Sequence, residues 1–243
     1  MAFQYSPKII TDGLVLAIDA ANIKSYPGTG TTVTDLSRRG NTGTLANGMS
    51  LVTDSIAGLC FDGDGINDNM QFGESADTKG TTNNAITYEC WVKREGTTPT
   101  FILPRLMSTD ASDYNALYID NAGEGVLYWR INIGGVTLDR TYSSGLTLNE
   151  WTHVVGTAEY NGSSSYTQAL YINGQSVSST TAAASGTWGD GTSRLFAIFA
   201  NVENTYRNNN CLNGKVALAN VYNRALSSQE VLQNYNQTKS RFI

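Results

Sequence analysis

The sequence predicts an all-β protein, an antiparallel sandwich of two sheets that ends in one short α-helix. Three observations predict this fold class. Charged residues are only 15% of the 243 residues, well below the roughly 25% of typical globular proteins, and Thr, Ser, Asn and Gly take their place. Many short segments alternate between apolar and polar residues, which is the pattern of half-buried strands. Only the end of the chain changes to the period of a helix.

The predicted strands are separated by turn residues. Asn161-Gly162, Asn173-Gly174 and Gly134-Gly135 each lie between two alternating segments, as antiparallel hairpins require. A segment containing Trp188, residues 180–192, is expected to be a long loop. In chain order, the predicted strands cover residues 13–19, 58–62, 69–73, 85–93, 100–107, 114–120, 125–133, 135–142, 152–160, 167–173, 194–200 and 214–222.

The last predicted strand leads into the predicted helix. Residues 214–222 are apolar on both faces, so we expect this strand to be covered on both sides. The following helix is predicted to close the sandwich, with Leu232 and Tyr235 on its inward face.

The start of this helix has two local signals. Ser227 and Glu230 have the spacing of a capping box, and Leu226 and Val231 have the spacing of a hydrophobic staple. Together they predict a helix over residues 228–240.

Several segments resemble, in the same order, the motifs of concanavalin A-like lectin/glucanase domains of the laminin G type. They are Gly58-Leu-Cys-Phe-Asp-Gly63, Ala85-Ile-Thr-Tyr-Glu-Cys-Trp-Val-Lys93, Trp151-Thr-His-Val-Val155, Ala169-Leu-Tyr-Ile-Asn-Gly174 and the C-terminal strand with its helix. The resemblance implies an antiparallel two-sheet jelly-roll sandwich (concanavalin A-like) with a short C-terminal α-helix, formed as one domain by residues 13–243. Residues 1–12 are either an extended N-terminal docking arm or a frayed or sheet-edge terminus.

The two ends of this domain have a narrower resemblance. Asp12 to Asn22 (Asp-Gly-Leu-Val-Leu-Ala-Ile-Asp-Ala-Ala-Asn) and Tyr235 to Phe242 look like the opening and closing segments of laminin G-like domains in structural proteins of tailed bacteriophages. This resemblance implies a non-enzymatic virion protein, either a capsid decoration or a tail or fibre-associated adhesion module. Its implied partners are other virion proteins, in many copies per particle, and host surface glycans. A free lectin-like module is the alternative.

Catalysis is the less favoured class of function. Glucanases with this fold carry a Glu-x-Asp-x-Glu pattern that places paired carboxylates in one cleft, and the sequence contains no such pattern. Glu89, Glu124, Glu159 and Glu203 are isolated. His153 is the only histidine, and we expect a structural role for it.

Two kinds of ligand, calcium and sugars, are compatible with particular residues. Asp62, Asp64, Asn67 and Asp68 concentrate the oxygen ligands that calcium prefers. An ordinary solvated turn fits the same residues, and the spacing is not that of an EF-hand loop.

Exposed aromatic side chains are the second kind of candidate, because sugar rings stack on them. Trp129, Trp188 and Tyr206 fall in predicted loops or on polar strand faces. Aromatic residues are also ordinary components of strands and sandwich cores, so a structural role is the alternative for each.

The remaining features exclude several partners. The net charge is −5 and the basic residues are scattered, so no surface for nucleic acid is expected. No apolar segment approaches the roughly 20 residues of a membrane span. The apolar segment at residues 14–18 is too short for a signal peptide and has acidic neighbours, so we expect synthesis in a host cytoplasm and assembly into a virion.

The cysteines, Cys60, Cys90 and Cys211, are odd in number and widely spaced. We expect buried free thiols, which are common among cysteines of protein cores. A single disulfide between Cys60 and Cys211 is the alternative.

Overall fold

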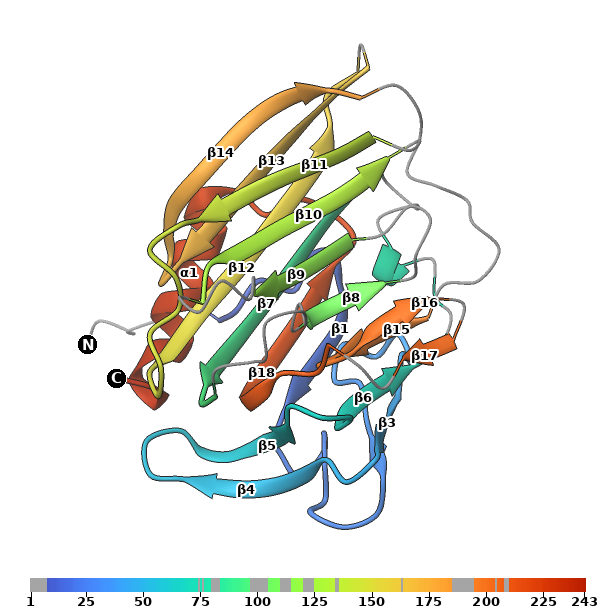
Figure 1. The fold of residues 1–243 in the computed structure, drawn as a ribbon, viewed down its shortest axis with the longest axis vertical. Helices are drawn as coiled ribbons and strands as arrows, with labels where there is room; N and C mark the ends of the chain where they lie inside the picture. The colour runs from blue at the N-terminus through green and yellow to red at the C-terminus, as the bar shows by residue number, and fades with distance from the viewer. Residues whose placement is uncertain are drawn as a thin grey trace, which may run out of the picture.

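The computed structural model describes residues 8–73, 75, 77–79, 84–96, 105–109, 115–119, 125–133, 136–162, 164–184, 195–203, 205–207 and 210–243. Within these residues, two eight-stranded antiparallel sheets pack face to face (Figure 1). The predicted all-β sandwich with one C-terminal helix is therefore confirmed.

The two sheets are called sheet A and sheet B. In spatial order, sheet A consists of β14 (Gln175–Ala183), β13 (Ser165–Ile172), β12 (Trp151–Tyr160), β7 (Ala85–Arg94), β18 (Asn213–Tyr222), β5 (Gly58–Asp64) and β4 (Ser50–Asp54), and β1 (Leu14–Asp19) also pairs with β18. Sheet B consists of β11 (Val136–Tyr142), β10 (Leu127–Ile133), β9 (Asn115–Ile119), β8 (Arg105–Thr109), β15 (Phe196–Ile198), β6 (Asn69–Phe72), β3 (Gly43–Ala46) and β2 (Thr32–Val33). A short hairpin, β16 (Asn201–Glu203) with β17 (Thr205–Arg207), and three helices, η1 (Asp77–Lys79), α1 (Ser228–Thr238) and η2 (Lys239–Arg241), complete the described elements.

The main core lies between the sheets and is centred on β7 and β10. Tyr88 of β7 has its ring centroid 5.3 Å from Trp129 of β10 and 5.4 Å from Phe196 of β15. Gly156 of β12 lies against Trp129, and a Cβ atom there would come within 2.5 Å of the indole. A glycine is therefore required at this position so that the indole can pack against the backbone.

The C-terminal helix packs on the outer face of sheet A. The capping box of Ser227 and Glu230 is present, and Leu226 and Val231 share one apolar cluster. The expectation for Leu232 is wrong, because its side chain is 37% exposed. It is one residue beyond the buried Val231, and the helical rotation of about 100° per residue turns it away from the sheet.

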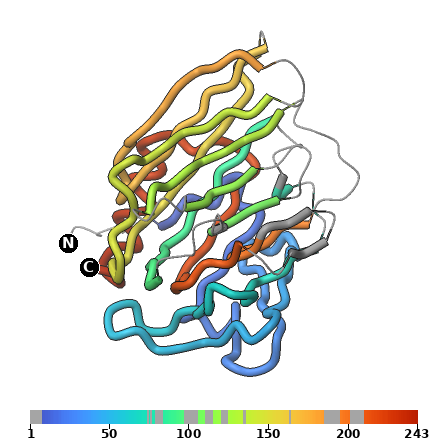
Figure 2. The backbone as a smooth tube through the Cα atoms, viewed as in Figure 1, coloured from blue at the N-terminus to red at the C-terminus, as the bar shows by residue number. Residues whose placement is uncertain are grey.

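Both ends of the described chain are held on this same outer face (Figure 2). Gln233 of α1 donates to Lys8 O at 2.7 Å, and Ile10 N donates to Asn234 Oδ1 at 2.8 Å. Arg241 of η2 forms an ion pair with Asp19 of β1, with 2.6 Å between Nη1 and Oδ1. Residues 8–12 are thus bound along the helix, whereas residues 1–7 of the expected arm lie outside the described residues.

Six strands were not predicted, namely β2, β3, β4, β16, β17 and β14. The last of these corrects the expected loop over 180–192, because residues 180–183 belong to β14. This edge strand consists of Ser, Thr, Ala and other small residues that are half-buried or exposed. It has no apolar face, so alternation does not reveal it.

Two further expectations can be compared with the structure. Cys60, Cys90 and Cys211 are buried free thiols, so the alternative Cys60–Cys211 disulfide is not formed. Among the described residues, no helix is long and apolar enough to cross a bilayer.

Candidate functional site

The candidate site is a polar and aromatic surface on the outer side of sheet B. Tyr128 of β10 lies directly opposite Tyr118 of β9. Their rings are stacked, with 5.0 Å between centroids and 10° between planes. Tyr118 is only 3% exposed, whereas Tyr128 is half-buried. Tyr128 therefore presents part of an aromatic ring that a second, buried ring holds in place.

A charged pair lies next to these rings. Arg130 of β10 is directly opposite Asp139 of β11. Its guanidinium forms two hydrogen bonds with the carboxylate, Nε to Oδ1 at 2.7 Å and Nη2 to Oδ2 at 2.5 Å. The guanidinium carbon is 5.2 Å from the centroid of the Tyr118 ring. Because this pairing is bidentate and rests on an aromatic ring, both polar groups have a fixed orientation.

The polar surface continues along the same two strands. The Arg130 and Asp139 side chains are 24% and 29% exposed, so solvent and ligands reach them. At the next outward-facing pair of residues in β10 and β11, Asn132 Nδ2 donates a hydrogen bond to Thr137 Oγ1 at 3.3 Å. Asn132 Oδ1 is a buried acceptor with no hydrogen-bond partner within the described part of the chain, and such an atom gains free energy when a donor reaches it.

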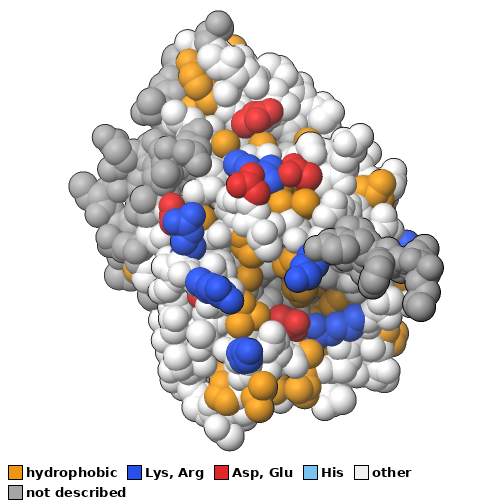
Figure 3. Space-filling view, turned by 180° about the vertical axis from the view of Figure 1, so that it is seen from behind, with side chains coloured by type: hydrophobic (Ala, Val, Ile, Leu, Met, Phe, Trp, Pro, Cys, Tyr) orange, Lys and Arg blue, Asp and Glu red, His pale blue; other side chains and the backbone are white. Residues whose placement is uncertain are grey.

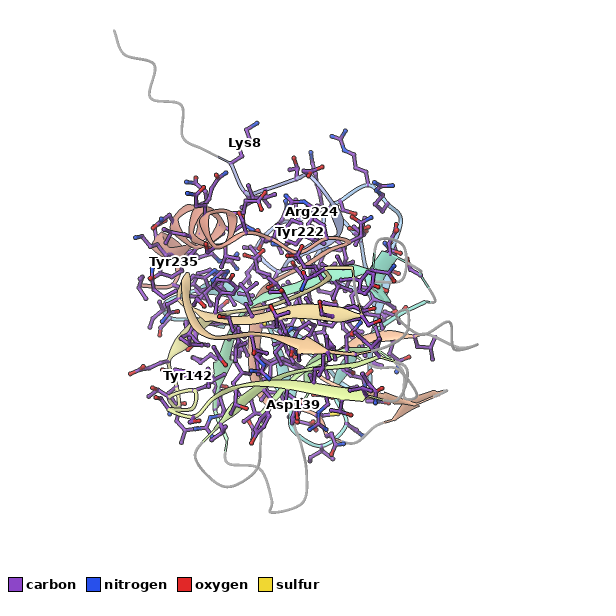
Figure 4. All side chains as sticks on the ribbon, turned by 90° about the horizontal axis from the view of Figure 1, so that it is seen from above. Lys8, Asp139, Tyr142, Tyr222, Arg224 and Tyr235 are labelled. Atoms are coloured by element: carbon purple, nitrogen blue, oxygen red, sulfur yellow. The ribbon has the colours of Figure 1, made fainter. Side chains whose placement is uncertain are left out.

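We call Tyr128, Arg130, Asn132 and Asp139 the β10–β11 face. Figure 4 shows Asp139 on the side of the sandwich opposite Tyr222, Tyr235 and Lys8. The β10–β11 face is therefore remote from the C-terminal helix. Substitutions of its residues should leave the packing of that helix unchanged.

The alternation of β10 builds this face and also corrects one prediction. Leu127, Trp129 and Ile131 point into the core, while Tyr128 and Arg130 point outward. Trp129 is fully buried, and its Nε1 donates to Thr157 O at 2.9 Å. It has no exposed ring for a sugar, so the expected sugar-binding role of Trp129 is wrong.

The other two aromatic candidates remain predictions. Trp188 lies outside the described residues. Tyr206 lies in β17, and its side chain is not among those that the structure describes. The sequence contained a usable signal for the β10–β11 face instead, because Gly134-Gly135 between two alternating segments predicts a hairpin in which residue 133 pairs with residue 136. The observed register has this pairing, and it places Arg130 opposite Asp139.

The expected calcium ligands form a turn that bonds to itself. Asp64 Oδ1 accepts hydrogen bonds from the backbone N–H groups of Ile66 at 2.8 Å and Asn67 at 3.1 Å. Asp68 Oδ2 accepts from Asp64 N at 3.3 Å, and Asp62 lies 3.4 Å from the Lys215 ammonium. No group of three or more His, Cys, Asp or Glu side chains is placed to hold a metal ion in the described ranges. The geometry thus fits the solvated-turn alternative.

A carboxylate and the single histidine do meet, but away from any surface. Glu89 of β7 and His153 of β12 are each 1% exposed, with 2.8 Å between Oε1 and Nε2. Asn220 and Asn234 donate to the other Glu89 oxygen at 2.9 and 3.0 Å. A general acid or base must reach its substrate, and this pair is enclosed by β18 and α1.

Of the other three isolated glutamates, only Glu159 has a described side chain. Glu159 is exposed at the end of β12. Glu124 lies outside the described residues, and for Glu203 only the backbone position in β16 is described.

Comparison with protein families now identifies the domain. Residues 64–232, more than half of the chain, match the laminin G family model described as the Concanavalin A-like lectin/glucanases superfamily. The chain belongs to this superfamily. A comparison with curated proteins found no match.

Solved structures share the superfamily fold at low sequence identity. The binding domain of Paraclostridial Mosquitocidal Protein 1 has a TM-score of 0.67 and 18% identity, over 93% of this chain and 52% of that one. Domain 4 of an arabinanase from Geobacillus stearothermophilus, solved with arabinotriose, has a TM-score of 0.64 and 16% identity, over 91% and 98%. Trypanosoma rangeli sialidase, solved with the inhibitor DANA, has a TM-score of 0.58 and 16% identity, over 95% and 33%.

These similarities concern the fold. The chain spans about half the length of the mosquitocidal binding domain and a third of the sialidase. Because one superfamily fold carries binding domains and enzymes alike, function must be argued from the β10–β11 face.

Proposed function

We propose that this chain is a non-catalytic glycan-binding module that is displayed on the particle of a tailed bacteriophage. Glycan binding is assigned to the β10–β11 face. The virion context rests on the resemblance of the Asp12 to Asn22 and Tyr235 to Phe242 segments to phage structural proteins, and a free lectin-like module is the alternative context.

The observation that carries the glycan assignment is the partly exposed array of Tyr128, Arg130 and Asp139. A sugar has an apolar C–H face, which packs on an aromatic ring, and hydroxyl groups, which need donors and acceptors in fixed positions. Arg130 supplies hydrogen-bond donors and Asp139 supplies acceptors, and the opposite charges of the two side chains nearly cancel. Neutral sugars are therefore favoured over acidic ones.

The fold comparison adds support of a different kind. The arabinanase domain was solved with a bound arabinose oligosaccharide, and this chain spans nearly its whole length. A module of this size and fold is thus sufficient to hold an oligosaccharide.

The glycan proposal is tested on an array of neutral and acidic glycans with the purified chain. We expect binding to neutral glycans that falls at least about tenfold in Tyr128→Ala and in Arg130→Ala, since tenfold corresponds to about 1.4 kcal/mol. The matched control is Tyr160→Ala, which removes a 41% exposed tyrosine from sheet A, and it should bind like the wild type.

Two results would overturn this assignment. One is the absence of any bound glycan, and the other is equal binding by all variants with unchanged melting temperatures. Release of reducing sugar from a bound polysaccharide would replace the binding module with a glycoside hydrolase.

The virion context needs a separate experiment. Mass spectrometry of purified particles should detect the chain in many copies, and the purified chain should co-sediment with particles that lack it. Glycan binding without any association with particles would favour the free lectin-like module.

A further inference from the structure

Most edge strands of the sandwich are covered on their outer edge or are very short, and β4 is the exception. The outer edge of β1 is occupied by a loop, since Ala17 N donates to Asp35 Oδ1 at 3.0 Å and Leu36 N donates to Ala17 O at 2.9 Å. The edges β14 and β11 lie side by side (Figure 1), and β2 has only two residues. Within the described residues, β4 has backbone hydrogen bonds to β5 alone.

An unpaired edge is a template for another strand, and monomeric proteins block such edges with charges or proline. The β4 sequence, Ser-Leu-Val-Thr-Asp, contains no Lys, Arg or Pro. Its one charged residue, Asp54, is 6% exposed and bonds to Lys93 and to Trp151 Nε1. This carboxylate points to its own domain, so it does not block the edge.

Exposed apolar side chains surround the same edge. Ile23 is 76% exposed, Ile56 56% and Leu59 39%. Ile23 and Leu59 line a cavity of about 140 Å³ together with Leu51 of β4. Figure 3 shows hydrophobic side chains gathered at the lower end of the molecule, where Figure 1 places β4 and β5. We call Ile23, Leu51, Ile56 and Leu59 the β4 patch.

We propose that β4 and the β4 patch bind a second copy of this chain, through antiparallel pairing of the two β4 strands about Val52. In this register, Ser50 lies opposite Asp54 of the second copy and Leu51 lies opposite Thr53, so no like charges meet. The contact is isologous, with the same surface on both partners.

A whole second domain fits this surface better than a single added peptide. A peptide strand would satisfy the edge of β4 but would leave Ile23 and Leu59 in water. A two-fold axis perpendicular to sheet A would place the β4 patches of the two copies side by side on the same side of the joined sheet. Each patch would then cover the other.

This arrangement goes beyond glycan binding and has a consequence for it. A two-fold axis perpendicular to the sheets keeps the outer side of sheet B in the same direction in both copies. The two β10–β11 faces then point the same way, and simultaneous binding to one surface raises the apparent affinity.

The proposal is tested by analytical ultracentrifugation of the full chain over a dilution series. We expect a species of twice the 26.2 kDa chain mass that dissociates on dilution. The variant Ile23→Lys with Thr53→Lys should be monomeric at every concentration, because it places charges in the patch and on the exposed edge position. The matched control is Ile66→Lys, which changes a 71% exposed isoleucine outside the patch and should still dimerise.

Hydrogen exchange supplies a second measurement. In the wild type, β4 amide groups should exchange faster on dilution, as the strand edge becomes free. A wild type that is monomeric at all concentrations overturns the proposal, including the case in which it binds only a different virion protein. A dimer that survives in Ile23→Lys with Thr53→Lys, with the melting temperature unchanged, places the contact elsewhere. Neither result affects the glycan assignment, which is tested separately with the Tyr128→Ala and Arg130→Ala variants.

Discussion

At the residue scale, Glu89 organises the outer side of sheet A. Its carboxylate contacts His153, Asn220 and Asn234, which come from β12, β18 and α1. Tyr222 lies 3.3 Å from the same carboxylate and donates to Ile10 O at 3.2 Å. One buried acidic group therefore connects three strands, the C-terminal helix and the N-terminal segment.

This environment predicts a large loss of stability in Glu89→Ala. The donors of Asn220 and Asn234 would lose a buried acceptor, and breaking such a buried network costs about 3–5 kcal/mol. A lowered denaturant midpoint is the measurement. Glu159→Ala, which removes an exposed carboxylate from the adjacent strand, should change the free energy of unfolding by less than about 0.5 kcal/mol. Equal midpoints for the two variants would show that the network is dispensable.

At the element scale, the segments Asp12 to Asn22 and Tyr235 to Phe242, on which the virion proposal rests, form one structural unit. Asp19 of the opening segment pairs with Arg241 of the closing segment, and Arg224, which precedes the helix, binds Glu230 with 2.6 Å between Nη2 and Oε1. These contacts hold the C-terminal helix on sheet A. The two segments therefore have a shared structural role in closing the domain.

The start of this helix predicts a dependence of stability on pH. Hydrogen bonding to Arg224 lowers the pKa of Glu230 from 4.5 to about 2. A lowered pKa in the folded state means that the stabilisation is complete above pH 4.5 and is lost as the pH falls towards 2. Glu230→Gln should therefore unfold more easily than the wild type near neutral pH, by about 1 kcal/mol, and the difference should vanish near pH 2.

Thermal melting across this pH range is the measurement, and Ser227→Ala is the control. Ser227→Ala removes the N-cap hydroxyl but keeps the carboxylate and Arg224, so its deficit should persist at low pH. A constant difference between Glu230→Gln and the wild type at all pH values would contradict the role of the charge.

The element scale also shows where prediction from sequence succeeds. The helix is predicted correctly because its capping box depends on Ser227 and Glu230, which are only three residues apart. The strands β7 and β18 are predicted correctly because their apolar residues form continuous patterns. The strands β4 and β14 are missed because an edge strand pairs on one side only and needs no regular apolar face. The inward prediction for Leu232 fails because the sheet contacts a narrow stripe of the helix, which Val231 and Asn234 occupy.

At the scale of the whole molecule, the core encloses three thiols. Burial raises the pKa of Cys60 to about 11 and that of Cys211 to about 12, and burial raises the pKa of Cys90 as well. Since the thiolate is the reactive form, a thiol reagent at mildly alkaline pH should not label the folded protein.

Unfolding without reductant should make all three cysteines reactive at once, and quantitative labelling by mass spectrometry measures this. Labelling of only one cysteine in the unfolded chain would indicate a disulfide. Rapid labelling of the folded chain would show that the sandwich opens locally around a cysteine.

Local patterns in the amino-acid sequence were enough to predict the fold class, the positions of most strands along the chain and the C-terminal helix, because alternation and capping act between residues close in the chain. Which side chains are exposed depends on the tertiary structure. The sequence places Trp129 in a strand, but its indole is buried because it packs against Gly156 of sheet A. Tyr128, Arg130 and Asp139 become one surface only when β10 and β11 pair in register. Such a surface depends on contacts between strands and on what covers each face, and local sequence patterns carry neither.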